Sequence, residues 1–547
     1  MKITIENSKG KALSSLLKPE DRKKYVAAII GGKTKDLNYL LPDDKKTEID
    51  YLDYTFPIAQ RIYEASFRYL IGLAIKAIDK NYDVRFFYNI SRSIFCRIIE
   101  KNQTPVRVRP EMVEEIKEKI NGMIQEDIPF ERIKISKEEA LAHYKALGFV
   151  NKVQVLSYRP EDYVHIHHSV YRDLDYYDYL YSFLVPSSGY LKDFNLLYYA
   201  PGFLLQLPRA ECGGKIPPFE DEEKFAATLA STSHWAEMNS LDTVAHINAF
   251  VKDYSPLALI DLSEARFNNK MTEVGKEIVH SEETIKVIAI AGPSSSGKTS
   301  FANRLTYELM SRGLRPVRIS CDNFYIPREK LPKGTSLESI EALDLDFFND
   351  TLLSLTEGEE VTLPLYDFKS GLRTEGKKLK LKSNQPLIIE GIHALDERMT
   401  RNIADSEKFR IYIAPQPQVN IDNHSPLSMT DLRLLRRIAR DARTRGSSAK
   451  ETISMWPDVR EGEFLYIYPN QENADYVFDS FLPYEPGALR SIVLPLLEKV
   501  TPEDQEYPVA TRLKQMIRYF LPLPITDIPC CSILREFVGG TCYKDAR

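Results

Sequence analysis

The stretch "IAIAGPSSSGKTS", residues 288–300, decides the fold of the C-terminal half of this chain. The apolar run at 287–291 predicts a buried parallel strand, and residues 299–310 carry apolar side chains at helical spacing. Between them lies a turn with the spacing G-x-x-x-x-G-K-T, which begins at Gly292. Such a turn aims several backbone N–H groups at one point, at the positive end of the helix dipole, and therefore predicts a phosphate-binding loop.

The polar groups of this loop predict how a nucleotide is held. We expect Lys298 to reach the β- and γ-phosphates of a nucleoside triphosphate and the Thr299 hydroxyl to bind Mg²⁺. The other residues expected to contact the phosphates are Gly292, Ser294, Ser295, Ser296, Gly297 and Ser300. The sequence therefore predicts ATP and Mg²⁺ as cofactors, without indicating which molecule receives the phosphate.

The composition is that of an ordinary water-soluble protein. With 547 residues, 43% of them hydrophobic and 28% charged, the chain is long enough for several domains. With a net charge of −5, the chain lacks the excess of basic residues that is typical of nucleic-acid-binding proteins. No run approaches the roughly 20 apolar residues of a membrane span, and the start lacks a signal-peptide core. The six cysteines form no C-x-x-C pair, so a reducing cytoplasm is expected.

The order of predicted elements divides the chain into four regions. Residues 1–50 alternate short strands with turns and predict a small β-rich module. Residues 51–215, which open with a long amphipathic helix at 57–80, predict a mixed α/β domain. A helical connector is expected at 216–280. Over 281–547 strands alternate with helices, so we predict an α/β fold with a doubly wound parallel sheet.

Two carboxylates follow further predicted strands of this sheet. Asp322 lies just past the strand at 317–320, on the edge where such sheets bind ligands. A carboxylate there can accept the proton of an attacking hydroxyl, although a helix N-cap is the alternative role. Glu390 ends the next predicted strand and can complete the Mg²⁺ shell.

A run of arginines lies on one later helix and its end. These are Arg436, Arg437, Arg440, Arg443 and Arg445. Arginines at this spacing can close over a triphosphate and stabilise the charge that develops during transfer. A solvated basic face is the alternative.

Five motifs in this order resemble the uridine kinase and phosphoribulokinase family over about residues 285–485. They are "GPSSSGKTS", "SCDNFY", "LPLYDFKSGLR", "IIEGIHAL" and "RRIARDARTRG". The resemblance implies that Asp322 is the general base and that Glu390 lies on the metal side. The other residues implied to be catalytic are Lys298, Arg440 and Arg445. The residues implied to bind the acceptor are Tyr325, Glu338, Tyr366, Phe368 and Arg437.

Two positions depart from the family pattern. Animal uridine-cytidine kinases carry a histidine three residues after the phenylalanine of the Y-D-F motif, and it helps to read the pyrimidine. Here this position is Gly371. Their ribose-binding aspartate aligns with Glu338, whose side chain is one methylene longer. We therefore predict phosphoryl transfer, but not the recognition of uracil.

The N-terminal half resembles modules of threonyl-tRNA synthetases. Residues 1–50 are similar to a TGS (β-grasp) module, and the next region is similar to the editing domain. The histidines of the editing H-x-x-x-H motif are replaced by Ala65 and Tyr69, so we expect no editing activity. His165 and His167 share a strand face, but no third metal ligand is evident, and a structural role is favoured.

Together these features predict a cytoplasmic, ATP- and Mg²⁺-dependent kinase that phosphorylates a primary hydroxyl of a ribonucleoside, uridine or cytidine first. One alternative is the same chemistry on another sugar or polyol. The other is an RNA-binding regulator whose N-terminal half grips tRNA-like RNA while nucleotide switches its shape. We expect a small-molecule substrate, no membrane partner and a homo-oligomer.

Overall fold

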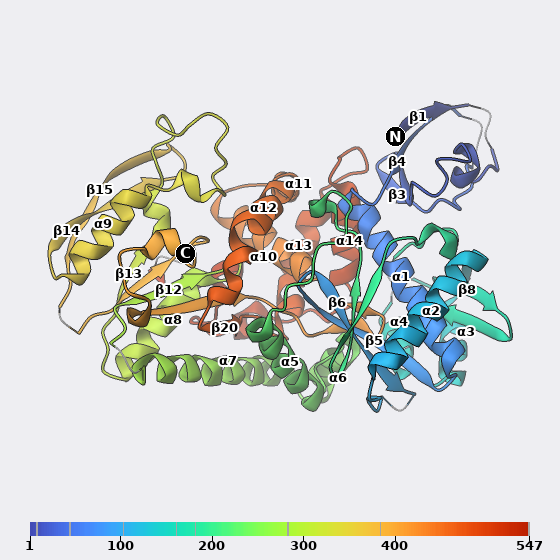
Figure 1. The fold of residues 1–547 in the computed structure, drawn as a ribbon, viewed down its shortest axis with the longest axis horizontal. Coiled ribbons are helices and arrows are strands. Elements are labelled where there is room, and N and C mark those ends of the chain that lie inside the picture. Colours follow the sequence, from blue (N-terminus) through green and yellow to red (C-terminus); the bar gives the residue numbers. More distant parts are fainter. Residues whose placement is uncertain are drawn as a thin grey trace.

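Two halves of the chain lie side by side in the computed structural model (Figure 1). The N-terminal half, blue to cyan, packs against a C-terminal half that contains the strands and helices after residue 285. The structure describes residues 1–6, 9–42, 45–101, 103–159, 161–180, 182–281, 284–382 and 384–544. No helix among these residues is both long and apolar enough to cross a membrane.

A five-stranded parallel sheet forms the centre of the C-terminal half. Its order is β13 (Val317–Ser320), β16 (Leu387–Glu390), β12 (Val287–Ala291), β17 (Lys408–Ala414) and β20 (Tyr476–Asp479). The central strand β12 is buried along its whole length, as expected of a parallel strand covered on both faces. The predicted parallel sheet is confirmed.

Alternate side chains of β12 point into two different apolar cores. Ile288 and Ile290 pack with α8 (Lys298–Ser311), α10 (Met429–Thr444) and α13 (Glu485–Glu498). Ala289 packs on the opposite side with α9 (Leu345–Thr356). The period of two along a strand therefore supplies apolar contacts for helices on both faces of the sheet.

Further elements surround this sheet. An antiparallel hairpin, β14 (Glu360–Asp367) and β15 (Leu372–Lys380), lies at one end of the molecule (Figure 1). The later helices are α11 (Ala449–Ser454), α12 (Trp456–Gly462), α14 (Tyr507–Ile517) and the short α15 (Arg535–Val538).

The helices that precede the sheet share apolar cores with its strands. They are α5 (Glu223–Met238), α6 (Val244–Asp253) and α7 (Pro256–Val279). Helix α7 packs on α8, where Glu264 binds Arg304 at 3.1 Å and accepts a hydrogen bond from the Tyr484 hydroxyl at 2.7 Å. This helix therefore belongs to the same apolar core as the phosphate loop's helix.

The described residues of the N-terminal half form three small sheets. The first is antiparallel, in the order β1 (Lys2–Ile5), β4 (Thr47–Leu52), β2 (Ala27–Ile30) and β3 (Lys33–Lys35). The second joins β10 (Asn195–Tyr199), β11 (Gly202–Gln206), β6 (Ser93–Glu100) and β5 (Tyr82–Ile90). The third joins β7 (Glu131–Ser136), β8 (Tyr163–Tyr171) and β9 (Leu174–Asp178).

Four α-helices accompany these sheets among the described residues of this half. They are α1 (Pro57–Ile78), α2 (Pro110–Glu126), α3 (Lys137–Ala146) and α4 (Val150–Ser157). The long helix predicted at 57–80 is confirmed by α1. The similarity of this half to synthetase modules stays a prediction.

A hairpin of the C-terminal half, β18 (Asn420–Asp422) with β19 (Ser425–Pro426), docks into the N-terminal half. Its His424 is 2% exposed and binds two carboxylates, Asp178 through Nδ1 at 2.6 Å and Asp83 through Nε2 at 3.0 Å. Lys152 pairs with Asp178 and lies 3.6 Å from Asp422. A buried charge that loses its partner is costly, so this network resists separation of the halves.

The network predicts how stability depends on pH. Burial by itself would lower the pKa of His424, but Asp178 and Asp83 outweigh burial and raise it to about 9. The stabilisation is therefore complete below the unfolded pKa near 6.5 and is lost as the pH rises through 9. We expect the free energy of unfolding, measured in urea, to fall by on the order of 3 kcal/mol over this range.

A matched pair of variants isolates this contribution. In His424→Gln the free energy of unfolding should no longer fall over this pH range. At pH 6.5 this variant should be less stable than wild type, because two buried carboxylates have lost their cation. In His280→Gln, which changes an exposed histidine, the fall should remain. An equal pH dependence in wild type and His424→Gln would contradict the assignment.

Candidate active site

The loop between β12 and α8 is wound so tightly that its glycines are required. Ser295 and Gly297 have positive φ angles of 61° and 92°. A Cβ atom at Gly292 would lie 2.0 Å from the backbone oxygen of Ile413, which no side chain can tolerate. The close approach of the loop to β17 thus requires a glycine at position 292.

Several polar groups of the loop fit an anionic ligand. The hydroxyls of Ser295 and Ser296 are buried and have no hydrogen-bond partner among the described residues. The Lys298 ammonium group turns back to donate to the carbonyls of Gly292 at 2.9 Å and Pro293 at 3.3 Å. Buried hydroxyls without partners and a folded-back lysine are groups that phosphate oxygens can satisfy.

Two arginines of α10 hold this loop from behind. Arg433 donates through Nε to the Ser294 carbonyl at 3.0 Å, and Arg436 donates through Nη1 to the Ser296 carbonyl at 3.2 Å. Both arginines are completely buried. Their ion-pair partners are the buried Glu463 and Glu485, respectively. Arg436 is therefore buried and does not belong to a solvated basic face. Arg433, which the sequence motifs did not identify, holds the loop in the same way.

Three of the arginines expected to close over a triphosphate, Arg437, Arg440 and Arg445, are called the lid arginines here. They gather around one buried carboxylate, Asp441. Arg437, Arg440 and Arg445 lie 3.3, 2.9 and 3.7 Å from it, respectively. Arg437 also donates to the Ser294 hydroxyl at 3.0 Å. Burial and then the repulsion from Arg440 lower the pKa of both Arg437 and Arg445. Three guanidinium groups around one carboxylate leave an excess of positive charge beside the loop.

Asp322 and Glu390 meet at the carboxyl edge of the sheet. The parallel register aligns Ser320, Glu390 and Ile290, so the residues that follow β13 and β12 converge on Glu390. Burial, followed by repulsion from Asp322, raises the pKa of Glu390 to about 7. Burial also raises the pKa of Asp322, against the attraction of Lys298 and Arg445. A carboxylate with a raised pKa suits proton transfer near neutral pH.

The alternative role of Asp322 as a helix cap finds no support in the local geometry. The short 3₁₀ turn at this point is Cys321–Phe324, and its N-cap position is Ser320. Asp322 lies inside the turn, where part of its surface reaches solvent although the surrounding protein desolvates its carboxylate enough to raise the pKa.

The aromatic residues predicted to bind the acceptor form one cluster. The ring centroids of Tyr325, Tyr366 and Phe368 lie 5.0–5.5 Å apart. The Tyr325 hydroxyl donates to the Leu337 carbonyl at 2.9 Å, whereas the buried Tyr366 hydroxyl has no partner among the described residues. Phe368 is 46% exposed and offers an open ring face.

Arg328 fills the space beside Gly371. Gly371 has a φ of 72°, and a Cβ atom there would lie 2.8 Å from the Cβ of Arg328. The Arg328 guanidinium donates to the Phe368 carbonyl at 3.0 Å. A histidine at position 371 would therefore be strained and would collide with Arg328. The departure from the family pattern thus brings a different polar side chain to the edge of the aromatic cluster.

The remaining predicted acceptor residue, Glu338, lies near Arg437. Burial raises the pKa of Glu338, and Arg437 opposes this shift. His393, which belongs to the motif "IIEGIHAL", is 2% exposed. Neither of its ring nitrogens has a hydrogen-bond partner among the described residues. Burial lowers the pKa of His393 to about 4, so its ring is neutral.

The two residues that stand in place of the editing histidines lie inside the apolar core of the N-terminal half. Ala65 and Tyr69 are buried, and the Tyr69 ring packs against Phe130. His167 is also buried and its Nε2 lies 3.2 Å from the Ser182 carbonyl. Burial lowers the pKa of both His165 and His167 to about 4.

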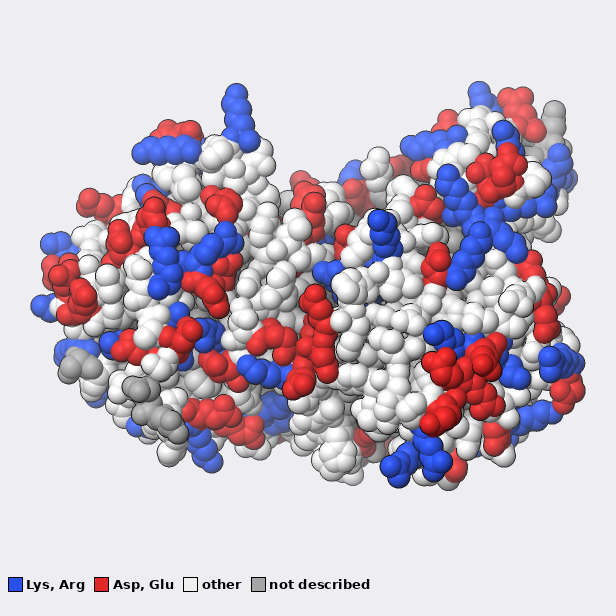
Figure 2. Space-filling view, in the orientation of Figure 1, with Lys and Arg blue, Asp and Glu red and all other residues white. Residues whose placement is uncertain are grey.

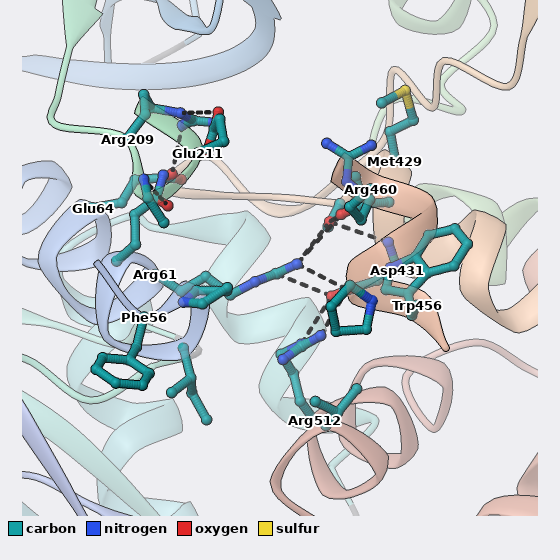
Figure 3. A pocket seen from close by; sticks show the side chains of 18 of the residues that line it. Phe56, Arg61, Glu64, Arg209, Glu211, Met429, Asp431, Trp456, Arg460 and Arg512 are labelled. Carbon is teal, nitrogen blue, oxygen red and sulfur yellow. Dashed lines mark hydrogen bonds and ion pairs between the residues drawn. The ribbon is translucent and has the colours of Figure 1, made fainter. Parts of the chain in front are cut away.

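A separate cavity of about 2180 Å³ lies between the two halves (Figure 3). Arg61 of α1 and Arg512 of α14 converge there on Asp431, each at 2.9 Å. Asp431 lies in the first turn of α10, the helix that carries the loop-holding arginines. Lys298, Asp322 and Glu390 do not line this cavity, so it is distinct from the candidate active site.

Comparison with known proteins places the similarity in the C-terminal half. Residues 287–483 match the Phosphoribulokinase / Uridine kinase family. A "Uridine kinase" of Borrelia duttonii (strain Ly) is 30% identical over 197 residues, which are 35% of this chain and 85% of that protein. A "Uridine kinase" of Staphylococcus aureus (strain JH9) is 30% identical over 196 residues, 35% of this chain and 86% of that protein.

A solved structure, "Structure of a Possible Uridine Kinase from Bacillus stearothermophilus", is 20% identical. The match covers 39% of this chain and 100% of that chain, with a TM-score of 0.29. The residues that match the family contain the phosphate loop, Asp322, Glu390 and the arginines of α10.

The loop geometry predicts the effect of removing the Lys298 ammonium group. Lys298→Ala should weaken the binding of Mg²⁺–ATP at least about tenfold, because a charge-assisted contact to phosphate is lost. Isothermal titration calorimetry checks this. Lys377→Ala, which removes an exposed lysine from β15, is the matched control and should bind as wild type does. Unchanged affinity in Lys298→Ala would contradict the assignment of the loop.

Proposed function

We propose that this chain, which belongs to the phosphoribulokinase / uridine kinase family, transfers the γ-phosphoryl group of ATP to the 5′-hydroxyl of a ribonucleoside. The observation that carries the proposal is the convergence of a phosphate loop, two carboxylates and an arginine cluster at one sheet edge. A cluster of aromatic rings lies beside them. Phosphoryl transfer needs positioning and charge stabilisation above all, and this edge offers both.

Each residue has a role in the proposed reaction. Lys298 leaves its own loop carbonyls and binds the β- and γ-phosphates. Thr299 and Glu390 would hold Mg²⁺, which when bound neutralises charge on these phosphates. Asp322 accepts the proton of the acceptor hydroxyl. Arg437, Arg440 and Arg445 stabilise charge on the transferred group, and their excess positive charge around Asp441 supports this role.

Uridine and cytidine are the proposed acceptors. Two matched relatives are described as uridine kinases, and the aromatic cluster offers ring faces on which a base can stack. The pyrimidine carbonyl oxygens need donors, and Arg328 is the donor-bearing side chain beside Gly371. A sugar or polyol is the second candidate, because Gly371 itself offers no group to read a base.

The observed charges do not favour the RNA-binding alternative. Acidic residues outnumber basic ones in the lining of the cavity between the halves. On the face shown in Figure 2, basic and acidic side chains are interspersed on both halves. A site for a nucleic-acid backbone needs a continuous basic stripe.

A coupled assay for ADP with a panel of nucleosides, sugars and polyols tests the proposal. We expect turnover with uridine or cytidine in the presence of Mg²⁺, and none when the 5′-hydroxyl is replaced by hydrogen. Turnover with sugars but with no nucleoside would favour the second candidate. A protein that binds ATP yet turns over no acceptor would contradict the proposed reaction.

The role of Asp322 yields a separate prediction. Asp322→Asn keeps the shape of the side chain but cannot accept a proton, so kcat should fall at least about 10²-fold. The affinity for ATP should change little, because Lys298 and the loop amides are untouched. Asp350→Asn, at an exposed position of α9, is the matched control. A kcat of Asp322→Asn within about threefold of wild type would remove Asp322 from the catalytic residues.

A further inference from the structure

The C-terminal segment, residues 528–544, folds back over the phosphate loop. The Tyr543 ring stacks on Tyr307 of α8, with the ring centroids 6.2 Å apart. Ile533 packs against the loop so closely that a Cβ atom at Gly297 would lie 2.4 Å from its Cδ1. The Ser532 hydroxyl lies 2.8 Å from the Tyr484 hydroxyl, inside the core. This segment lies outside the residues that match the family.

A carboxylate of this segment binds the start of α8. Oε2 of Glu536 accepts hydrogen bonds from the Ser300 backbone N–H at 3.2 Å and from the Ser300 hydroxyl at 2.8 Å. Ser300 is the third residue of α8, so its N–H has no acceptor within the helix. A negative charge at this position is favoured by the helix dipole, as a phosphate would be.

Glu536 has no close cationic partner of its own. Among the described residues it forms no ion pair, and its charge instead acts on Lys298, where it opposes the lowering of the pKa by burial. The backbone of the same residue is held by Arg443, which donates to the Glu536 carbonyl at 2.9 Å. The Arg436 guanidinium lies over the ring of Phe537, 5.0 Å from its centroid. The segment thus contacts both the loop and α10.

We propose that Glu536 is a built-in competitor of the nucleotide, and that the C-terminal segment must move when a nucleoside triphosphate binds. The N–H groups at the start of this helix are those that cradle the α- and β-phosphates in loops of this type. A carboxylate and a phosphate oxygen cannot both occupy the Ser300 donors, because like charges in contact repel strongly. The carboxylate therefore has to leave before the phosphate chain is fully bound.

The consequence is a weaker apparent affinity for nucleotide. If the segment covers the loop about nine tenths of the time, the apparent dissociation constant rises about tenfold. Because Arg443 and Arg436 contact the same segment, its displacement also frees contacts of α10, the helix that carries the lid arginines. The C-terminal segment, which lies outside the residues that match the family, thereby regulates the proposed kinase site. This inference rests on the proposed function only because it takes the ligand to be a nucleotide.

Two variants of the full chain test the proposal by nucleotide binding alone. Glu536→Gln removes the charge and Glu536→Ala removes the contact. Both should bind Mg²⁺–ATP and inorganic tripolyphosphate about three- to tenfold more tightly than wild type in calorimetry. Asp527→Asn, which changes an exposed carboxylate just before the segment, should bind as wild type does. If both variants fold but bind these ligands no more tightly than wild type, the proposal is overturned. The segment would then be a static part of the site.

Hydrogen exchange of the unaltered protein provides a second test. Adding Mg²⁺–ATP should raise amide exchange in residues 528–544, and protection of these residues would overturn the proposed displacement. No acceptor is needed in either experiment. An enzyme that fails in the acceptor assay but shows tighter binding in Glu536→Gln would therefore contradict only the proposed reaction. Failure of every variant to bind either ligand would contradict both.

Discussion

Two buried arginines on α10 are the constraint on which the rest of the active site depends. Arg433 and Arg436 donate to carbonyls of the phosphate loop while each is paired with a buried glutamate. These bonds from behind fix the path of the loop around the point where an anion would bind. Removing a glutamate would leave an uncompensated buried charge, so the loop, α10 and the helices that follow it are coupled.

The N-terminal half acts on the same helix from its other end. Arg61 and Arg512 fix Asp431 in the first turn of α10, and the His424 hairpin joins the two halves through buried charges. Helix α10 therefore carries the arginines that hold the phosphate loop and, in its first turn, the aspartate that pairs with Arg61 of the N-terminal half. The N-terminal half and the loop thus contact the same helix.

The local pattern of the sequence was enough to predict the strand, loop and helix around Gly292, the parallel sheet and helix α1. Register then brings Asp322 and Glu390 to the loop, since the carboxyl ends of parallel strands share one edge. Contacts between distant residues were beyond such reasoning. Nothing near Arg433 in the sequence reveals Glu463, and nothing near Gly371 reveals Arg328, because tertiary packing alone brings each pair together. The same holds for Glu536, which lies more than two hundred residues from Ser300.

In the proposed reaction, this sheet edge delivers a phosphoryl group to a nucleoside hydroxyl rather than to water. Phosphorus-31 nuclear magnetic resonance of the protein with ATP, Mg²⁺ and uridine or cytidine tests this directly, because each phosphorus-containing product has its own signal. We expect a nucleoside 5′-monophosphate that accumulates in step with ADP. ADP accompanied only by inorganic phosphate, with either nucleoside, would contradict it.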